Sequence, residues 1–323
     1  MTRITPSLAV LAALLTPGLS AAPAHAQQAR SFVSGLGSDT NAPNCTRTAP
    51  CRTFQVAHDN TIASGEITVL DPGSYGSVII NRNISIINDG VGEAGALVSG
   101  GGVGITVNAG ANDRVSLRGL TIKGLDFQYG GSNGIKFISA ASLTVENCAI
   151  RNMTGDGIDV VSSIPANTSV TFTVSNTFVS DNGGNGIYVA PHDQGTLVAV
   201  FNRVELYNNS AHGLGLDASN GNVFIHGAVT ESVSANNGLA GFVLSAPSGF
   251  GLPSHLSIIR SVAYSNGTLG AQSDGISAFV LLGENFMMAN KSGTDFKFTN
   301  SGSIGSYGDN MAGGVANFPQ SKQ

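Results

Sequence analysis

One segment of about 28 residues recurs along most of the chain, and this repeat limits the fold more than any other feature does. Residues 171–189 show one copy, in which a stretch of alternating polar and apolar residues leads through an Asn/Gly turn into a shorter alternating stretch. Fixed self-similarity at such a period indicates a solenoid. The first slot of the repeat follows the longer stretch and holds Asn147, Asn176, Asn202, Glu231, Arg260 and Asn285.

Two further slots repeat with the first. The second slot lies five or six residues later, before a turn, and holds Asn152, Asn182, Asn208, Asn236, Asn266 and Asn290. The third slot is a Gly followed by an apolar residue, and it begins at Gly104, Gly134, Gly157, Gly186, Gly213, Gly241 and Gly275. We expect equivalent slots to lie above one another in successive coils.

The local pattern distinguishes a solenoid of strands from one of helices. Helical repeats need runs of 10 or more residues with a period near 3.6, whereas segments such as 84–86 and 143–145 alternate with period 2. The 43 Gly, the absence of Trp and the low charge agree with short strands joined by turns. We therefore predict an all-β parallel β-helix whose coils stack at about 4.8 Å.

The Asn residues of the second slot are predicted to be structural. Asn tolerates left-handed backbone angles in a tight turn, and its amide bonds local backbone groups. Identical amides stacked from coil to coil can also bond one another. The sequence thus predicts a structural Asn ladder of Asn152, Asn182, Asn208, Asn236, Asn266 and Asn290.

The first 26 residues have the pattern of a secretory signal peptide. Arg3 precedes an apolar run from Leu8 to Leu15, and Ala24-His25-Ala26 supplies the small-residue cleavage motif before Gln27. We expect an N-terminal cap over residues 27–64, a β-helix over 65–310 and a flexible tail over 311–323. An exported protein, periplasmic or extracellular, is the resulting prediction.

Charge and hydropathy bear on the partners. Removal of Arg3 would leave 14 basic and 20 acidic side chains, a net charge of −6 (14 − 20). Phosphate binding needs clustered Lys and Arg, so a nucleic-acid partner is not expected. The run from Leu8 to Leu15 is too short to span a bilayer, and no later stretch reaches about 20 apolar residues. We expect a monomer.

The three cysteines fit an oxidising compartment. Cys45 and Cys51 close a short loop, and export would let them form a disulfide. Cys148 is left over and is expected to be a buried free thiol. A metal site made by these cysteines is not expected, because no Cys-x-x-Cys or matching His pair accompanies them.

Five short motifs follow the signal peptide, at residues 32–34, 37–39, 50–57, 65–69 and 72–75. Together they resemble the N-terminal cap and first coil of the pectate-lyase-like right-handed parallel β-helix proteins. The resemblance implies a single-stranded right-handed solenoid of about eight to nine coils with an N-terminal cap, whose short helix covers the apolar end of the first coil. Uncharacterised secreted bacterial β-helix proteins are the members that the chain resembles most.

Outward-facing columns are where a solenoid places its chemistry. The residue after each Gly-apolar pair points outward, which gives the column Thr106, Lys136, Asp159, Tyr188, Gly215, Val243 and Ser277. Lys136 would bind a sugar carboxylate or act as a base, Tyr188 would stack on a sugar ring, and Asp159 would serve acid/base chemistry or bind calcium. The bland alternative is a surface salt bridge beside an exposed Tyr, worth about 0 to 1 kcal/mol.

A turn column precedes each Gly and holds Asn133, Asp156, Asn185, His212, Ala240 and Asp274. The segment from Asp156 to Asp159 is similar to the Asp-Gly-Ile-Asp of polygalacturonases, and His212-Gly213 to part of their Gly-His-Gly. Ala211 replaces the first Gly of that motif. Residues 188–193 resemble the Asp-Pro-His-Glu site of alginate epimerases, with Ala190 in place of their Asp.

The predicted function is contact with carbohydrate, acidic polysaccharide included. The sequence leaves open whether the protein is an enzyme. If it is a polysaccharide lyase or glycoside hydrolase, Asp156 or Asp159 would be the acid/base or a calcium ligand, Lys136 the carboxylate partner or base, and His212 the proton shuttle. The alternative is a non-catalytic surface, adhesion or structural module, favoured by the small uncharged residues Gly215, Val243 and Ser277.

Overall fold

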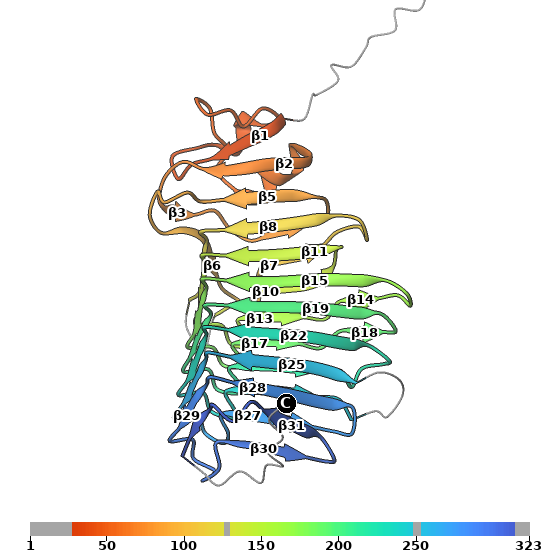
Figure 1. Ribbon diagram of the computed structural model, residues 1–323. Coiled ribbons are helices and arrows are strands. Elements are labelled where there is room, and N and C mark those ends of the chain that lie inside the picture. The colour runs from red at the N-terminus through yellow and green to blue at the C-terminus, as the bar shows by residue number, and fades with distance from the viewer. Residues whose placement is uncertain (1–27, 126–129, 248–252, 314–323) are drawn as a thin grey trace, which may run out of the picture.

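The computed structural model describes residues 28–125, 130–247 and 253–313. The expected signal peptide and residues 314–323 of the expected tail lie outside these ranges. Three long parallel sheets, here called A, B and C, run the length of the molecule, and the chain visits them in turn in each coil (Figure 1). The predicted all-β parallel β-helix is confirmed.

Sheet A is the widest of the three. In order along the solenoid it holds β1 (Gln28–Val33), β2 (Thr61–Val69), β5 (Ile84–Ile87), β8 (Arg114–Arg118), β11 (Ser142–Glu146), β15 (Ser169–Ser175), β19 (Thr196–Asn202), β22 (Phe224–Thr230), β25 (Ser254–Ile259), β28 (Ala278–Gly283) and β31 (Ser303–Ser306). The alternating segments 84–86 and 143–145 lie in β5 and β11 of this sheet.

Sheet B follows sheet A after a corner that is two residues long in most coils. It holds β3 (Gly73–Ser74), β6 (Ala94–Val98), β9 (Thr121–Gly124), β12 (Ala149–Arg151), β16 (Phe178–Ser180), β20 (Glu205–Tyr207), β23 (Val233–Ala235), β26 (Val262–Tyr264), β29 (Phe286–Met288) and β32 (Met311–Ala312).

Sheet C closes each coil and carries the residues that the sequence singled out. It holds β4 (Val78–Ile80), β7 (Val103–Asn108), β10 (Asn133–Ser139), β13 (Ile158–Val160), β17 (Ile187–Val189), β21 (Leu214–Asp217), β24 (Phe242–Ser245), β27 (Ala271–Asp274) and β30 (Phe296–Thr299). A small two-stranded sheet, β14 (Ser163–Ile164) with β18 (His192–Asp193), projects from the loops between sheets C and A.

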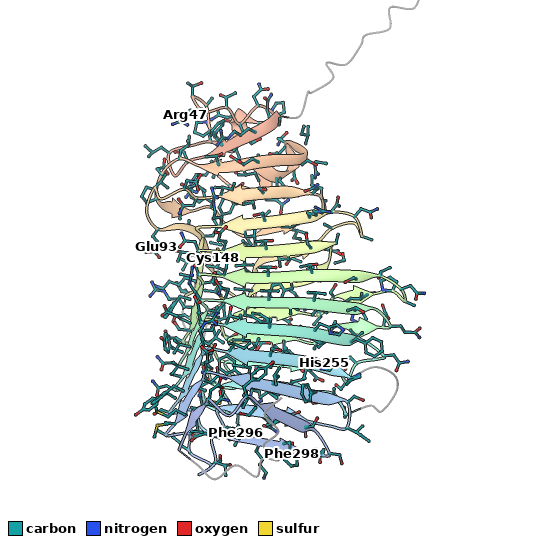
Figure 2. All side chains as sticks on the ribbon, viewed as in Figure 1. Arg47, Glu93, Cys148, His255, Phe296 and Phe298 are labelled. Carbon is teal, nitrogen blue, oxygen red and sulfur yellow. A yellow bond between two sulfur atoms is a disulfide. The ribbon has the colours of Figure 1, made fainter. Side chains whose placement is uncertain are left out.

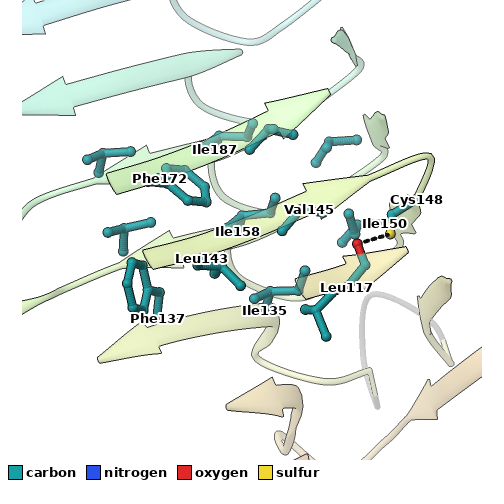
Figure 3. Packing of buried hydrophobic residues seen from close by; sticks show 14 of the residues in the cluster. Leu117, Ile135, Phe137, Leu143, Val145, Cys148, Ile150, Ile158, Phe172 and Ile187 are labelled. Carbon is teal, nitrogen blue, oxygen red and sulfur yellow. Dashed lines mark hydrogen bonds between the residues drawn. The ribbon is translucent and has the colours of Figure 1, made fainter. Parts of the chain in front are cut away.

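The interior of the coils is filled by stacked apolar side chains. Every second residue of each strand points inward, and equivalent inward residues lie over one another from coil to coil (Figure 3). Aromatic rings also contact one another across these stacks: Phe137 of sheet C lies 6.2 Å from Phe172 of sheet A, and Phe172 lies 5.8 Å from Phe201, measured between ring centroids. Because these side chains consume the interior, any ligand must bind to the outside of the sheets or to the loops.

The corner between sheets A and B depends on left-handed backbone angles. In six successive coils one corner residue has φ between 47° and 53°: Asn147, Asn176, Arg203, Glu231, Arg260 and Glu284. The first slot of the repeat was therefore wrong by one residue in two coils. Asn202 is the last residue of β19, and Asn285 follows Glu284 and points inward. The shift arises because the stretches of chain before these two corners differ in length by one residue from those in the other coils.

A ladder of buried Asn side chains runs through the turn between sheets B and C. Each Nδ2 donates to the Oδ1 of the Asn in the next coil at 2.9–3.0 Å. The ladder ends where Asn290 Nδ2 donates to Asp295 Oδ1 at 2.8 Å. Its members are Asn182, Asn209, Asn237, Asn266 and Asn290.

The predicted ladder thus exists, but half of its predicted members were wrong. Asn152, Asn208 and Asn236 lie one residue earlier in the turn, with φ between 54° and 61°. Asn208 and Asn236 are each followed by the Asn that does enter the ladder. A backbone turn with left-handed angles and a buried amide column both favour Asn, so the two roles lie side by side in one doublet.

A short helix covers the N-terminal end of the solenoid, as predicted. Helix α1 (Phe54–Asp59) begins at the N-cap Thr53, whose side chain accepts from Val56 N, and a 3-10 turn (Asp39–Asn41) precedes it. The Cys45–Cys51 disulfide closes the loop before the helix, and Cys148 is a buried free cysteine. Phe54 packs against Tyr75 with ring centroids 5.1 Å apart. The helix therefore covers apolar residues of the first coil.

Candidate functional site

The outward column of sheet C is in the predicted register over its first six coils. Lys136 pairs with Thr106 on one side and with Asp159 on the other, and Tyr188 follows Asp159. The column then continues through Gly215, Val243 and Gln272. Ser277 is not part of it, because the third slot in that coil is Gly270-Ala271 and not Gly275-Ile276. The side chain of Ile276 is 64% exposed, which agrees with a position outside the stack.

Lys136 and Asp159 form an ion pair on neighbouring strands. Lys136 Nζ lies 3.7 Å from Asp159 Oδ2, and the same oxygen accepts from Asn133 Nδ2 at 3.0 Å. The Asp159 side chain is only 11% exposed. Burial and the nearby Asp156 carboxylate raise the pKa of Asp159, and Lys136 opposes the rise. A buried carboxylate with a raised pKa beside a cation is a candidate for acid/base chemistry.

Asp156 belongs to the turn column just before β13. Its Oδ1 accepts from the backbone N and from Nδ2 of Asn185, at 2.6 and 2.9 Å. Burial raises the pKa of Asp156 despite these bonds. In the next coils Asn185 Oδ1 accepts from His212 N and His212 Nδ1 accepts from Ala240 N. Each polar side chain of this column therefore caps a backbone donor of the following coil.

The far end of the turn column differs from the prediction. The residue after Ala240 in this column is Leu269, since the backbone N of Gly241 donates to its carbonyl oxygen. Asp274 lies instead at the end of β27, where its carboxylate accepts from Thr299 Oγ1 and Asn300 Nδ2. The coil that contains Leu269 is shorter. The Asp-Gly pair at residues 274–275 has the residue types of the repeat, but it lies at a different position in the coil.

Tyr188 lies over the next coil instead of pointing straight out. A Cβ built on Gly215 would lie 3.2 Å from Tyr188 Cδ2, so the ring covers this glycine. The Tyr188 hydroxyl donates to Asp217 Oδ2 at 2.8 Å. Burial and the Asp217 carboxylate raise the pKa of Tyr188, which keeps the hydroxyl protonated. The ring is thus fixed at both ends along the sheet surface.

Asp217 and Asn133 are contacts of the site that sequence reasoning did not assign. Asp217 stands two residues after Gly215 on the same strand, so period-2 alternation places it on the same outer face. That spacing was a usable signal. The bond from Asn133 to Asp159 links the turn column of one coil to the outward column of the next, and a column-by-column reading of the sequence does not reveal it.

His212 is separated from the two carboxylates. It follows Asn185 in the turn column, two coils after Asp156, which corresponds to roughly 9.6 Å of stacked strands. Burial lowers the pKa of His212, and Nδ1 acts as an acceptor, so the imidazole is neutral with its proton on Nε2. The structure therefore brings together Lys136, Asp156, Asp159 and Tyr188 but places His212 beyond them.

The site residues do not suit a calcium ion. Ca²⁺ takes 6 to 8 oxygen ligands, whereas Asp159 Oδ2 already bonds an amide and an ammonium, and Asp156 Oδ1 accepts two N–H groups. Over the described ranges there is no group of three His, Cys, Asp or Glu side chains that could hold a metal. No helix in these same ranges is long and apolar enough to cross a membrane.

The sequence profile of the right-handed β-helix region matches residues 53–228 and 103–279 of this chain. The chain belongs to the right-handed β-helix family. This β-helix protein is similar in fold to pectate lyase Pel9A, with 18% identity and a TM-score of 0.56, over 87% of this chain and 78% of that one. It is also similar to the A-module of a mannuronan C-5 epimerase from Azotobacter vinelandii, with 20% identity and a TM-score of 0.52, over 71% and 70% of the two chains. No curated protein matches in sequence.

Proposed function

We propose that this β-helix protein is exported and binds polysaccharide along the outer face of sheet C. The observation that carries the proposal is the Tyr188 ring, held over Gly215 by its bond to Asp217, beside the Lys136–Asp159 pair. An aromatic ring next to carboxylates is the combination that binds a sugar, since the ring contacts the apolar face and the carboxylates accept from hydroxyls. The Cys45–Cys51 disulfide supports export.

The charge balance of this face favours recognition of hydroxyl groups over recognition of carboxylates. Lys136 is paired with Asp159, and Asp156 and Asp217 add further acidic groups. A uronate placed here would meet more negative than positive charge. The fold likeness to a pectate lyase and to a mannuronan epimerase supports polysaccharide as the ligand class, and it does not choose a sugar for this face.

The test is retention on immobilised glycans, neutral and acidic, with the substitution Tyr188→Ala. We expect Tyr188→Ala to lower affinity about tenfold, because an aromatic contact contributes ~0.5–1.5 kcal/mol beyond the area it buries and ~1.4 kcal/mol corresponds to a factor of ten. Phe279→Ala removes a ring from sheet A and serves as the matched control. Equal retention by Tyr188→Ala and the unaltered protein would remove sheet C from the proposal.

Catalysis is the second candidate, and the raised pKa values of Asp156 and Asp159 favour it. Asp159 would act as acid or base, with Lys136 beside it, in a lyase or hydrolase reaction. Ultraviolet absorbance of unsaturated product and the release of reducing ends distinguish these two reactions. Loss of product with Asp159→Asn but not with Glu284→Gln would establish the role. Binding without any product would favour the alternative that the protein is a non-catalytic module.

A further inference from the structure

The outer face of sheet B becomes entirely apolar over its last four strands, β23, β26, β29 and β32. This sheet lies on the side of the molecule where Cys148 is labelled (Figure 2). The middle residue of each three-residue strand is buried, so the residues on either side of it point outward. Register pairing places the outward residues in two columns, with Val233, Val262, Phe286 and Met311 in the first and Ala235, Tyr264 and Met288 in the second. These seven residues are called the apolar patch.

Much of the apolar patch is open to water. Phe286, Tyr264 and Met311 are 37%, 45% and 61% exposed. The rings of Tyr264 and Phe286 stack beside each other, with centroids 6.5 Å apart. A contiguous exposed apolar surface with a polar rim marks a binding site, and aromatic residues and Met are enriched at the cores of protein interfaces, where charges are depleted. The last coils of sheet B therefore have the composition of an interface core.

A line of charged corner residues borders the apolar patch on the side of sheet A. Four successive corners carry charges of alternating sign, held by Arg203, Glu231, Arg260 and Glu284. Glu231 pairs with Arg203 at 3.0 Å and with Arg260 at 3.5 Å, and all four side chains are exposed. The opposite border is uncharged and consists of the turn residues Asn236, Ser265 and Ala289. The patch thus has one charged edge and one neutral edge.

We propose that the apolar patch binds a second copy of the chain, related by a two-fold axis that runs parallel to the strands of sheet B. Such an axis sets the two sheets face to face with their solenoids antiparallel, and it brings the charged edge of one copy against the same edge of the other. An alternating order of two positive and two negative charges becomes its own complement when it is reversed. With the axis midway between Glu231 and Arg260, Glu231 meets Arg260 of the second copy and Arg203 meets its Glu284.

The same axis also matches the apolar columns. Because β23 and β26 lie on either side of it, Val233 meets Val262 of the second copy and Ala235 meets its Tyr264. A two-fold axis along the solenoid would instead place the charged edge of each copy against the neutral edge of the other. The corner charges would then gain no opposite charge from the second copy. A two-fold pair uses the same patch on both copies, so assembly stops at a dimer.

Glu205 is the acidic group that this contact must accommodate. It lies in the first column on β20, next to Val233, and it would face Phe286 of the second copy. A charge that faces an apolar ring loses water without gaining a partner, so removal of this carboxylate should strengthen the dimer. The inference differs from the monomer expected from the sequence. It does not depend on the binding proposed for sheet C, because the two surfaces share no residue.

The test is the mass of the whole protein by sedimentation equilibrium over a range of concentrations, at low and at high salt. We expect a monomer–dimer equilibrium that high salt weakens, because the corner charges are exposed. Phe286→Ser with Tyr264→Ser should abolish the dimer, and Glu205→Gln should strengthen it. Phe298→Ser with Ile79→Ser is the matched control, since these side chains of sheet C are 47% and 56% exposed, and it should leave the dimer intact.

Charge reversal tests the orientation of the two copies. Arg260→Glu sets two acidic groups opposite each other, and Glu231→Arg sets two basic groups opposite each other, so each variant alone should dimerise about tenfold more weakly. An equal mixture of the two variants should form a dimer with one copy of each, because all four corner contacts then join opposite charges. Arg and Glu both occupy this corner in the unaltered chain, and a thermal melt confirms that each variant is folded.

Loss of the dimer in the sheet B variants, with recovery in the mixture of charge variants, supports the proposal. A monomer at every concentration would overturn it, and so would a dimer that the sheet C control also removes. A mixture that stays monomeric would overturn the antiparallel arrangement. A dimer that forms only after deletion of residues 314–323 would show that those residues, and not a second copy, occupy the apolar patch. Glycan retention by Tyr188→Ala tests sheet C alone, so failure of one proposal leaves the other testable.

Discussion

Two neighbouring columns of side chains perform the same backbone task with different chemistry. In the Asn ladder, each buried amide accepts from the backbone N of the preceding coil, as Asn237 does from Asn209 N at 3.1 Å. In the turn column a few residues later, side chains also accept a backbone N, as Asp156 does from Asn185 N. The ladder uses Asn at each of its five positions. The turn column changes from Asn to Asp, to Asn, to His and then to apolar residues.

The difference shows where the fold requires one residue type and where it accepts several. Inside the turn, an amide is needed because it must accept and donate at once, and a carboxylate appears only at the end, where Asp295 has no further coil to donate to. The turn column needs only an acceptor, so Asn, Asp and neutral His all satisfy it. Where an acceptor suffices, titratable groups can be placed without loss of the fold. In this molecule they are placed beside Lys136 and Tyr188.

Breaking the ladder should have the largest effect. Asn237→Ala removes donors to Asn266 Oδ1 and Leu206 O and the acceptor for Asn209 Nδ2. These groups stay buried without partners, and each orphan costs about 1–3 kcal/mol. We expect a loss of roughly 3 kcal/mol in the free energy of unfolding, measured by urea denaturation.

Asn236→Ala is the matched control, one residue away. Asn236 is exposed and has a φ of 57°, so its replacement costs only the preference of Asn for left-handed angles, on the order of 1 kcal/mol. Equal losses at positions 236 and 237 would show that the ladder bonds contribute nothing beyond the turn.

The same doublet explains what the sequence could and could not predict. Period, strand positions and the outward residues Lys136, Asp159 and Tyr188 follow from alternation and spacing, because each side chain faces in or out by rule. Whether Asn236 or Asn237 enters the ladder depends on where the left-handed residue falls, and both positions favour Asn. Coils that gain or lose a residue, such as the one with Leu269, shift the columns, and only the backbone register shows the shift.

Gly215→Ala is the next perturbation in size. The new Cβ would lie 3.2 Å from Tyr188 Cδ2, so the ring must shift or lose its bond to Asp217. We expect a stability loss of about 1 kcal/mol, the usual size for a substitution that displaces one packed side chain, and weaker retention on the glycan that Tyr188 binds. Gly102→Ala, at an exposed position where a Cβ would meet nothing closer than 3.4 Å, is the control. Retention that is unchanged after Gly215→Ala would mean that the position of the ring does not matter for binding.

Removing the titratable group from His212 should change the pH dependence of stability. Burial lowers the pKa of His212 below 6.5, so the unfolded chain binds a proton more readily than the folded chain. The stability that this neutral His contributes is present above pH 6.5 and is lost as the pH falls through the folded pKa. His212→Asn keeps an acceptor for Ala240 N, as Asn133 and Asn185 do in the same column.

The expected result is a change within about 0.5 kcal/mol at pH 7 and a smaller loss of stability between pH 7 and pH 5. Urea unfolding at both values measures it. Acid sensitivity remains in part, because burial also lowers the pKa of His58, whose Nε2 accepts from Asn81 N. An identical pH slope in the variant would contradict the assignment of His212 as a neutral acceptor.

The smallest stability effect is expected for Asp156→Asn, and it has the opposite sign. Burial raises the pKa of Asp156, so the folded chain binds a proton more tightly than the unfolded chain, whose pKa is near 3.8. Ionised Asp156 therefore disfavours the folded state above its folded pKa, and the penalty fades as the pH falls toward 3.8. The amide keeps an acceptor for Asn185 and carries no charge. We expect a gain of up to about 0.5 kcal/mol at pH 7 that shrinks at pH 4, by urea unfolding at each pH. A loss at pH 7 would show that the carboxylate is structural, and the turn column would then differ from the ladder only in residue type.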